Sequence, residues 1–77
     1  PILLTIQPGG STWPDDPHEG DEFGYVLSGT VTLYLGEKRM RVRRGESFFY
    51  SPKHTHYLAN TGKSPAKVLW ISSPPSF

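Results

Sequence analysis

The chain has 77 residues, a formal net charge of +1 and no cysteine. This length corresponds to a single domain, and the lack of cysteine excludes disulfides and thiolate metal sites. The balanced charge gives no general attraction to nucleic acid or membranes, and no apolar run approaches the roughly 20 residues of a membrane-spanning helix. We therefore expect a soluble, cytoplasmic domain. Because so small a domain buries only about 60% of its unfolded surface, we expect a metal, a homodimer or a longer parent chain to stabilise it.

Short runs of apolar and β-branched residues follow one another along the chain. We expect strands, in chain order, at residues 2–6, 23–27, 31–35, 39–43, 47–50, 54–58 and 66–71. The eight glycines and eight prolines mark the turns between them. Short strands that recur every 8 to 12 residues or so, with no segment of helical period, predict an antiparallel all-β sandwich or barrel.

The first polar window, residues 10–29, lies between the first and third expected strands. Asp16, His18 and Glu22 have the same parity, so in an extended chain they point to one side together with Val26. Carboxylates and an imidazole that face a cavity are typical metal ligands. A solvated acidic loop with an incidental histidine is the alternative interpretation.

The second polar window, residues 45–60, contains the other two histidines. His54 and His56 also share parity, so both can point to the same side of an extended segment. The alternative interpretation is a polar loop that covers one end of a barrel.

The first window resembles the first conserved motif of the cupin superfamily, which has the form G-x5-H-x-H-x3-E-x6-G. Gly10, His18, Glu22 and Gly29 stand at the positions of that motif. Asp16 stands where the first histidine of the motif should be. The resemblance therefore covers four of the five landmarks of the motif without change, and it places an aspartate at the position of the first histidine.

The second window resembles the second cupin motif, G-x5-P-x-G-x2-H-x3-N. Gly45, His56 and Asn60 keep the positions of that motif. Pro52 stands one residue late, and Lys53 replaces the inner glycine. The two motifs together extend from residue 10 to residue 60, which is most of the chain.

The resemblance implies a small double-stranded β-helix, the antiparallel jelly-roll barrel of cupins, with residues 1–77 as a single domain. It implies that Asp16, His18, Glu22 and His56 hold one divalent transition metal, Zn, Mn, Fe or Ni. Because an aspartate oxygen lies closer to the backbone than a histidine Nε2, His54 is the other candidate to complete the site. In a pocket without metal, His18, Glu22 and His56 would bind an organic ligand directly.

Several apolar side chains are candidates for the wall of such a pocket. In a barrel this small, aromatic residues are expected in the core or at an interface, and in a cupin some of them would also line the ligand cavity. We expect the pocket wall to contain Val26, Phe48, Tyr50 and Trp70.

A narrower resemblance is to the cupin domains of transcriptional regulators of the Xre helix-turn-helix type. Residues 18–29 look like their phrase H-x-G-E-E-F-G-Y-V-L-x-G, and residues 68–77 are similar to their ending V-L-W-V-x-T-P-P-x-F. The resemblance implies a small-molecule sensor that forms the C-terminal part of a longer chain, with DNA bound only by an N-terminal helix-turn-helix outside these residues. A small metal-dependent enzyme of dioxygenase or isomerase type, and a storage or scaffolding barrel, are the alternatives.

Five of the eight basic residues lie close together, at Lys38, Arg39, Arg41, Arg43 and Arg44. One interpretation is the solvated face of an edge strand, where charge discourages pairing with other chains. The other is direct contact with phosphate groups. In the sequence no aromatic residue alternates with these charges, as binding of single-stranded nucleic acid would require.

Overall fold

Seven antiparallel strands make up the regular structure of the described residues. The computed structural model describes residues 2–12, 20–51 and 55–73. Its strands are β1 (Ile2–Ile6), β2 (Asp21–Ser28), β3 (Thr30–Leu35), β4 (Lys38–Arg43), β5 (Ser47–Tyr50), β6 (His56–Ala59) and β7 (Ala66–Ser73). The described ranges contain no helix, and so none that could cross a membrane. The prediction of an antiparallel all-β fold is confirmed.

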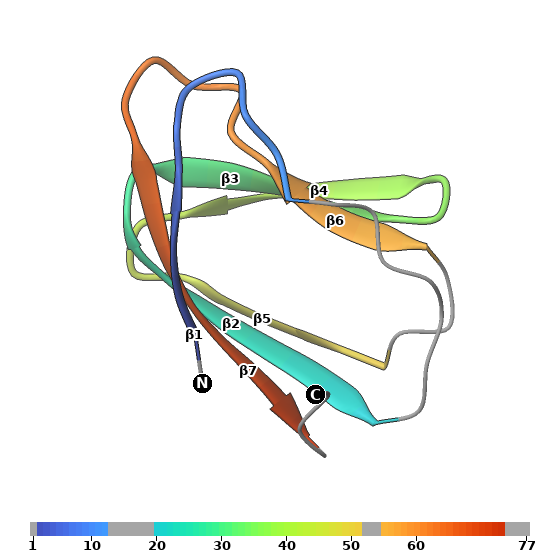
Figure 1. Cartoon of the computed structure of the whole chain (residues 1–77). Helices are drawn as coiled ribbons and strands as arrows, with labels where there is room; N and C mark the ends of the chain where they lie inside the picture. Colours follow the sequence, from blue (N-terminus) through green and yellow to red (C-terminus); the bar gives the residue numbers. More distant parts are fainter. Residues whose placement is uncertain (1, 13–19, 52–54, 74–77) are drawn as a thin grey trace.

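The strands form two sheets that face each other (Figure 1). One sheet has the order β1-β7-β2-β5 and the other has the order β4-β3-β6. In Figure 1 the two layers lie close together near the β2–β3 turn and diverge toward the β3–β4 turn. The residues after β1 cross from the first sheet to the second, where Ser11 forms a bridge with Ala59.

The β2–β3 turn joins the two sheets and requires a glycine. Gly29 has a φ of +77°, a left-handed backbone conformation that residues other than glycine rarely adopt. A Cβ at this position would also come within 2.8 Å of the carbonyl oxygen of Pro65. The glycine therefore allows β2 to turn sharply into β3 beside the start of β7.

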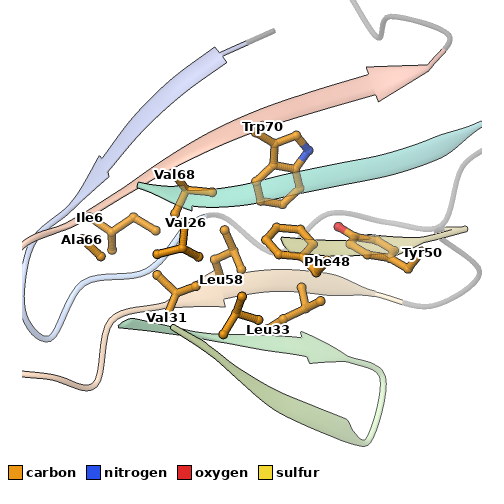
Figure 2. Close-up of a cluster of buried hydrophobic side chains, with 11 residues drawn as sticks. Ile6, Val26, Val31, Leu33, Phe48, Tyr50, Leu58, Ala66, Val68 and Trp70 are labelled. Carbon is orange, nitrogen blue, oxygen red and sulfur yellow. The ribbon is translucent and has the colours of Figure 1, made fainter. Parts of the chain in front are cut away.

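The core lies between the two sheets, and strand alternation explains which residues enter it. Along β2, Glu22, Gly24 and Val26 are buried while the residues between them are exposed. The buried apolar residues form one cluster, shown in Figure 2: Ile6, Val26, Val31, Leu33, Val42, Phe48, Tyr50, Leu58, Ala66, Val68 and Trp70. Each fully buried aliphatic or aromatic side chain contributes about 1.5–3 kcal/mol to stability.

Figure 2 shows that the cluster has two unlike ends. The aliphatic end contains the branched side chains of Val26, Val31 and Val68, which are fully buried. The aromatic end contains Phe48 and Tyr50 of β5 and Trp70 of β7, the two strands that flank β2. The candidate site lies at the aromatic end.

Candidate functional site

Glu22 is the buried carboxylate of this site. It lies on β2 opposite Tyr50 of β5 and Ser72 of β7, and only 3% of its surface is exposed. Its Oε2 accepts hydrogen bonds from the indole Nε1–H of Trp70 and, at 2.8 Å, from the hydroxyl of Ser72. Burial of a carboxylate is costly unless donors replace water. The two donors on β7 supply part of that replacement.

His56 reaches the same region from the opposite sheet. It begins β6, pairs with Leu35 of β3 and is fully buried. Its ring meets the ring of Tyr50 edge to face, with centroids 5.3 Å apart and planes at 63°. Tyr50 therefore neighbours Glu22 through the strand register and His56 through its ring. The fold brings the carboxylate and the imidazole to the same end of the core.

Three aromatic rings form the apolar wall beside these polar groups. Phe48 lies nearly parallel to Tyr50 at a centroid distance of 6.0 Å and meets Trp70 edge to face at 5.8 Å. Phe48 also lies directly against β2, because a Cβ on Gly24 would overlap its ring. Gly24 is thus the feature of β2 that admits the aromatic wall.

The structure brings together part of the predicted site. Glu22 and His56 lie with the expected wall residues Phe48, Tyr50 and Trp70, whereas Val26 packs in the aliphatic end of the core. The other candidate ligands, Asp16, His18 and His54, fall outside the described residues.

Ser72 was not predicted from the sequence. Its hydrogen bond to Glu22 depends on the pairing of β2 with β7, which joins residues 50 positions apart in the chain. The parity that Ser72 shares with Trp70 was the signal that could have identified it.

Asn60, the last residue of the second motif, has a structural role. It is 1% exposed, and its Nδ2 donates to the carbonyl oxygens of Ile6 and Ser64, each at 2.8 Å. Its Oδ1 accepts from the backbone N–H of Gly62 at 2.9 Å. Asn60 therefore fastens the end of β1 and the β6–β7 loop to the end of β6.

The donor chemistry at the site fits a divalent transition metal in part. A carboxylate oxygen and an imidazole nitrogen are ligands that Zn, Mn, Fe and Ni accept, and Glu22 and His56 supply one of each. Among the described residues no group of three or more such side chains is assembled. Glu22 and His56 are thus the two of the four implied ligands that lie among the described residues.

Comparison with known proteins identifies the family. The model of the cupin domain family matches residues 2–72. The chain belongs to the cupin domain family. Glu22 and His56 therefore lie buried in the interior of a cupin domain.

Two curated relatives illustrate the range of proteins that contain this cupin domain. This chain is 36% identical, over 91% of its length, to mannose-1-phosphate guanylyltransferase RfbM of Salmonella typhimurium, and it spans 15% of that protein. It is 28% identical over 99% of its length to the HTH-type transcriptional regulator PuuR of Escherichia coli, and spans 41% of that protein. The chain thus spans less than two thirds of the length of the curated relatives it matches.

Solved structures show the same fold. The cupin domain of an XRE family transcriptional regulator from Enterobacter cloacae superposes with a TM-score of 0.84. The match covers 96% of this chain and 79% of that chain at 17% identity. This likeness shows that the two chains share the cupin fold.

Proposed function

We propose that this cupin domain is the small-molecule sensor of a transcriptional regulator. The observation that carries the proposal is the burial of Glu22 and His56 beside Phe48, Tyr50 and Trp70. Ligand pockets are mostly apolar and aromatic, with a few polar groups that orient the ligand. A ligand with a flat apolar part and a cationic or donor-rich group would match both the rings and the carboxylate.

The proposed ligand set for a bound metal is Asp16, His18, Glu22 and His56, with His54 as the alternative to Asp16. One divalent transition metal, Zn, Mn, Fe or Ni, would supply a Lewis acid for an oxygen of the small molecule. Glu22 would contribute the negative charge that such a metal requires, and His56 a neutral imidazole. Without a metal, Glu22 and His56 would form hydrogen bonds directly with the small molecule, as acceptor and donor.

The domain organisation forms part of the same proposal. Residues 1–77 would be the single C-terminal cupin domain of a longer cytoplasmic chain, in which a separate N-terminal helix-turn-helix binds DNA. The similarity to PuuR over 99% of this chain supports this arrangement. The DNA-binding domains can adopt more than one arrangement in such a chain. A small molecule that binds the cupin domain more tightly in one of these arrangements would shift the population toward that arrangement. An upstream reading frame without a helix-turn-helix would contradict the proposal.

We also propose a homodimer through the outer face of the β1-β7-β2-β5 sheet. Leu3, Phe23 and Phe49 point outward from three of its strands and are 62%, 37% and 67% exposed. Exposed apolar patches on small domains are typical of interaction surfaces, and a two-fold axis lets one such patch cover its own copy. A monomeric mass by sedimentation at tens of micromolar would contradict this proposal.

The sensor proposal is tested by what the purified domain retains. Native mass spectrometry and metal analysis would be applied to protein prepared without chelator, to the Glu22→Gln variant and to the exposed control Glu46→Gln. We expect wild type and the control to retain the same metal or small molecule. We expect Glu22→Gln, which keeps an acceptor for Trp70 and Ser72 but loses the charge, to retain about tenfold less.

Two results would overturn the sensor proposal. One is equal retention by Glu22→Gln and wild type. The other is wild-type protein that holds less than about a tenth of an equivalent of any metal and shows no thermal shift with any member of a metabolite library.

The second candidate is a small metal-dependent enzyme of dioxygenase or isomerase type. The observation that favours it is the same buried carboxylate and imidazole, since these groups serve acid–base and metal chemistry in dry sites. A retained molecule recovered unchanged after incubation in air with the metal-loaded domain supports the sensor. Its conversion to an oxidised or isomeric product supports the enzyme.

A further inference from the structure

The outer face of the β4-β3-β6 sheet carries arginine and tyrosine side chains together. Arg39, Arg41 and Arg43 occupy alternate positions of β4, so they share one side of the strand. The strand register places Tyr34 of β3 between Arg39 of β4 and Tyr57 of β6. We call these five residues the arginine–tyrosine face. The basic segment of the sequence contains no aromatic residue, and β3 and β6, the other two strands of the sheet, supply the two tyrosines.

The two tyrosines form a stacked pair on this face. Their ring centroids are 4.5 Å apart and their planes differ by 11°, and both side chains are partly exposed. A shallow groove with a volume of about 460 Å³ runs beside them. Its described lining is Thr32, Tyr34, Arg39, Arg41, Arg43 and Thr61, with no acidic residue. The groove therefore combines three guanidinium groups, two threonine hydroxyl groups and the phenol ring of Tyr34.

The nearest acidic residues along the chain do not enter the groove lining. Glu37 lies in the β3–β4 turn and Glu46 in the β4–β5 turn, one at each end of β4. Glu46 is engaged locally, since its Oε1 accepts from the backbone N–H of Arg43 at 2.7 Å. The positive charge of the face is thus concentrated over β4 itself, although the net charge of the whole chain is only +1.

We propose that the arginine–tyrosine face binds single-stranded nucleic acid. Successive arginines on one side of a strand are about 7 Å apart, so they form a row that can follow a phosphate backbone. Aromatic rings beside a basic groove are the surface on which unpaired bases stack. In this arrangement Arg39, Arg41 and Arg43 contact phosphates, and a base stacks on the tyrosine pair.

The shape of the face favours a single strand over a duplex. Three strands about 4.8 Å apart make a nearly flat surface about 10 Å wide before side chains are added. The major groove of B-DNA, about 12 Å wide, admits a helix or a two-stranded ribbon, so this face could touch only the duplex backbone. Bases of a single strand, in contrast, are free to turn toward the tyrosines. The arginine–tyrosine face is on the outer side of its sheet, whereas Glu22 and His56 are buried on the inner side. The proposal is therefore independent of ligand binding in the core.

The test is fluorescence anisotropy with a labelled twelve-nucleotide oligothymidine at low salt. Arg39→Gln/Arg41→Gln removes two charges from the face, and Lys63→Ala/Lys67→Ala removes two charges elsewhere as the matched control. We expect the arginine variant to bind about tenfold or more weakly and the lysine control to bind within about twofold of wild type. A plot of the logarithm of the association constant against the logarithm of the salt concentration should have a slope of about −2 for wild type, with three phosphate contacts. The arginine variant, with one contact left, should give a slope of about −0.7.

Three competitors identify the ligand. A duplex of the same length, an abasic deoxyribose phosphate chain and polyglutamate should each bind several-fold more weakly than oligothymidine. Equal binding of the duplex or of the abasic chain would overturn the proposal, because it would show that unpaired bases are not needed. Equal binding of polyglutamate would overturn it too, because it would show that neither bases nor phosphates are needed. Equal loss in the lysine control, or no binding by wild type, would also overturn it. Thermal unfolding of the arginine variant, whose substituted side chains are exposed, should match wild type.

Discussion

The two ends of the core differ in what their side chains can do. The aliphatic end packs branched side chains such as Val26 and Leu58, which are fully buried and have no polar atoms. The aromatic end packs Phe48 and Trp70 around the buried Glu22, whose carboxylate needs donors from β7. The comparison teaches that one end contributes mainly stability, while the other gives up part of that stability to keep a carboxylate and an imidazole out of water.

The largest loss of stability is expected at the aliphatic end. Leu58→Ala would leave a cavity among fully buried neighbours and should lower the free energy of unfolding by about 3 kcal/mol. Leu27→Ala, at a position 44% exposed, is the matched control and should cost less than about 0.5 kcal/mol. Urea unfolding measures both. If Leu58→Ala still folds, its retained metal or small molecule should equal that of wild type. A specific loss of that molecule would break the division between the two ends.

An intermediate loss is expected where the two ends meet, at Gly24. Gly24→Ala would place a methyl group in the space occupied by the Phe48 ring, and overpacking of this kind costs about 1–3 kcal/mol. Adding Phe48→Leu should restore part of the stability by removing the overlapping ring atoms. Thermal unfolding of the single and double variants measures this. A Gly24→Ala variant as stable as wild type would show that the aromatic wall does not depend on close approach to β2.

The smallest loss is expected from the donors of Glu22. Trp70→Phe keeps a ring but removes the indole N–H, and should cost about 1.5 kcal/mol because the lost bond serves a buried carboxylate. Ser72→Ala, at a partly buried position, should cost about 1 kcal/mol. A double-mutant cycle of Trp70→Phe with Glu22→Gln measures the part of their interaction that depends on the charge of Glu22, and should give a coupling above about 0.5 kcal/mol. Zero coupling would mean that the negative charge of Glu22 does not strengthen its hydrogen bond with Trp70.

Local sequence patterns were enough to predict the strands. Glycine and proline separate them, and all seven appear at or close to the expected residues. β6 begins at His56 rather than at residue 54, and two strands are longer than expected: β2 begins at Asp21 rather than at Phe23, and β7 continues to Ser73. Pairing of Glu22 with Tyr50 and Ser72 extends both strands over residues that look like loop in isolation. Tertiary pairing therefore overrides weak local preference at those ends.

The candidate site was predictable only where one strand or one motif carries the information. Glu22 and His56 follow from parity and from their positions in the motifs. Ser72 and the Tyr34–Tyr57 stack depend on which strands become neighbours and in which register. A period-two pattern gives the side of a residue but not its partner across the sheet. Contacts between strands are therefore the part of the site that the sequence alone left open.

The position of β7 between β1 and β2 has a consequence for how the domain is made. The first strand has no place in its sheet until the last strand is present, because β1 pairs with β7 and not with β2. β7 also brings Trp70 and Ser72 to the carboxylate of Glu22. A nascent chain that ends before residue 66 would thus carry a free leading strand and a glutamate without these donors. Synthesis of residues 66–73 therefore completes the sheet and brings both donors to Glu22 in one event, and the many distant pairings favour slow folding.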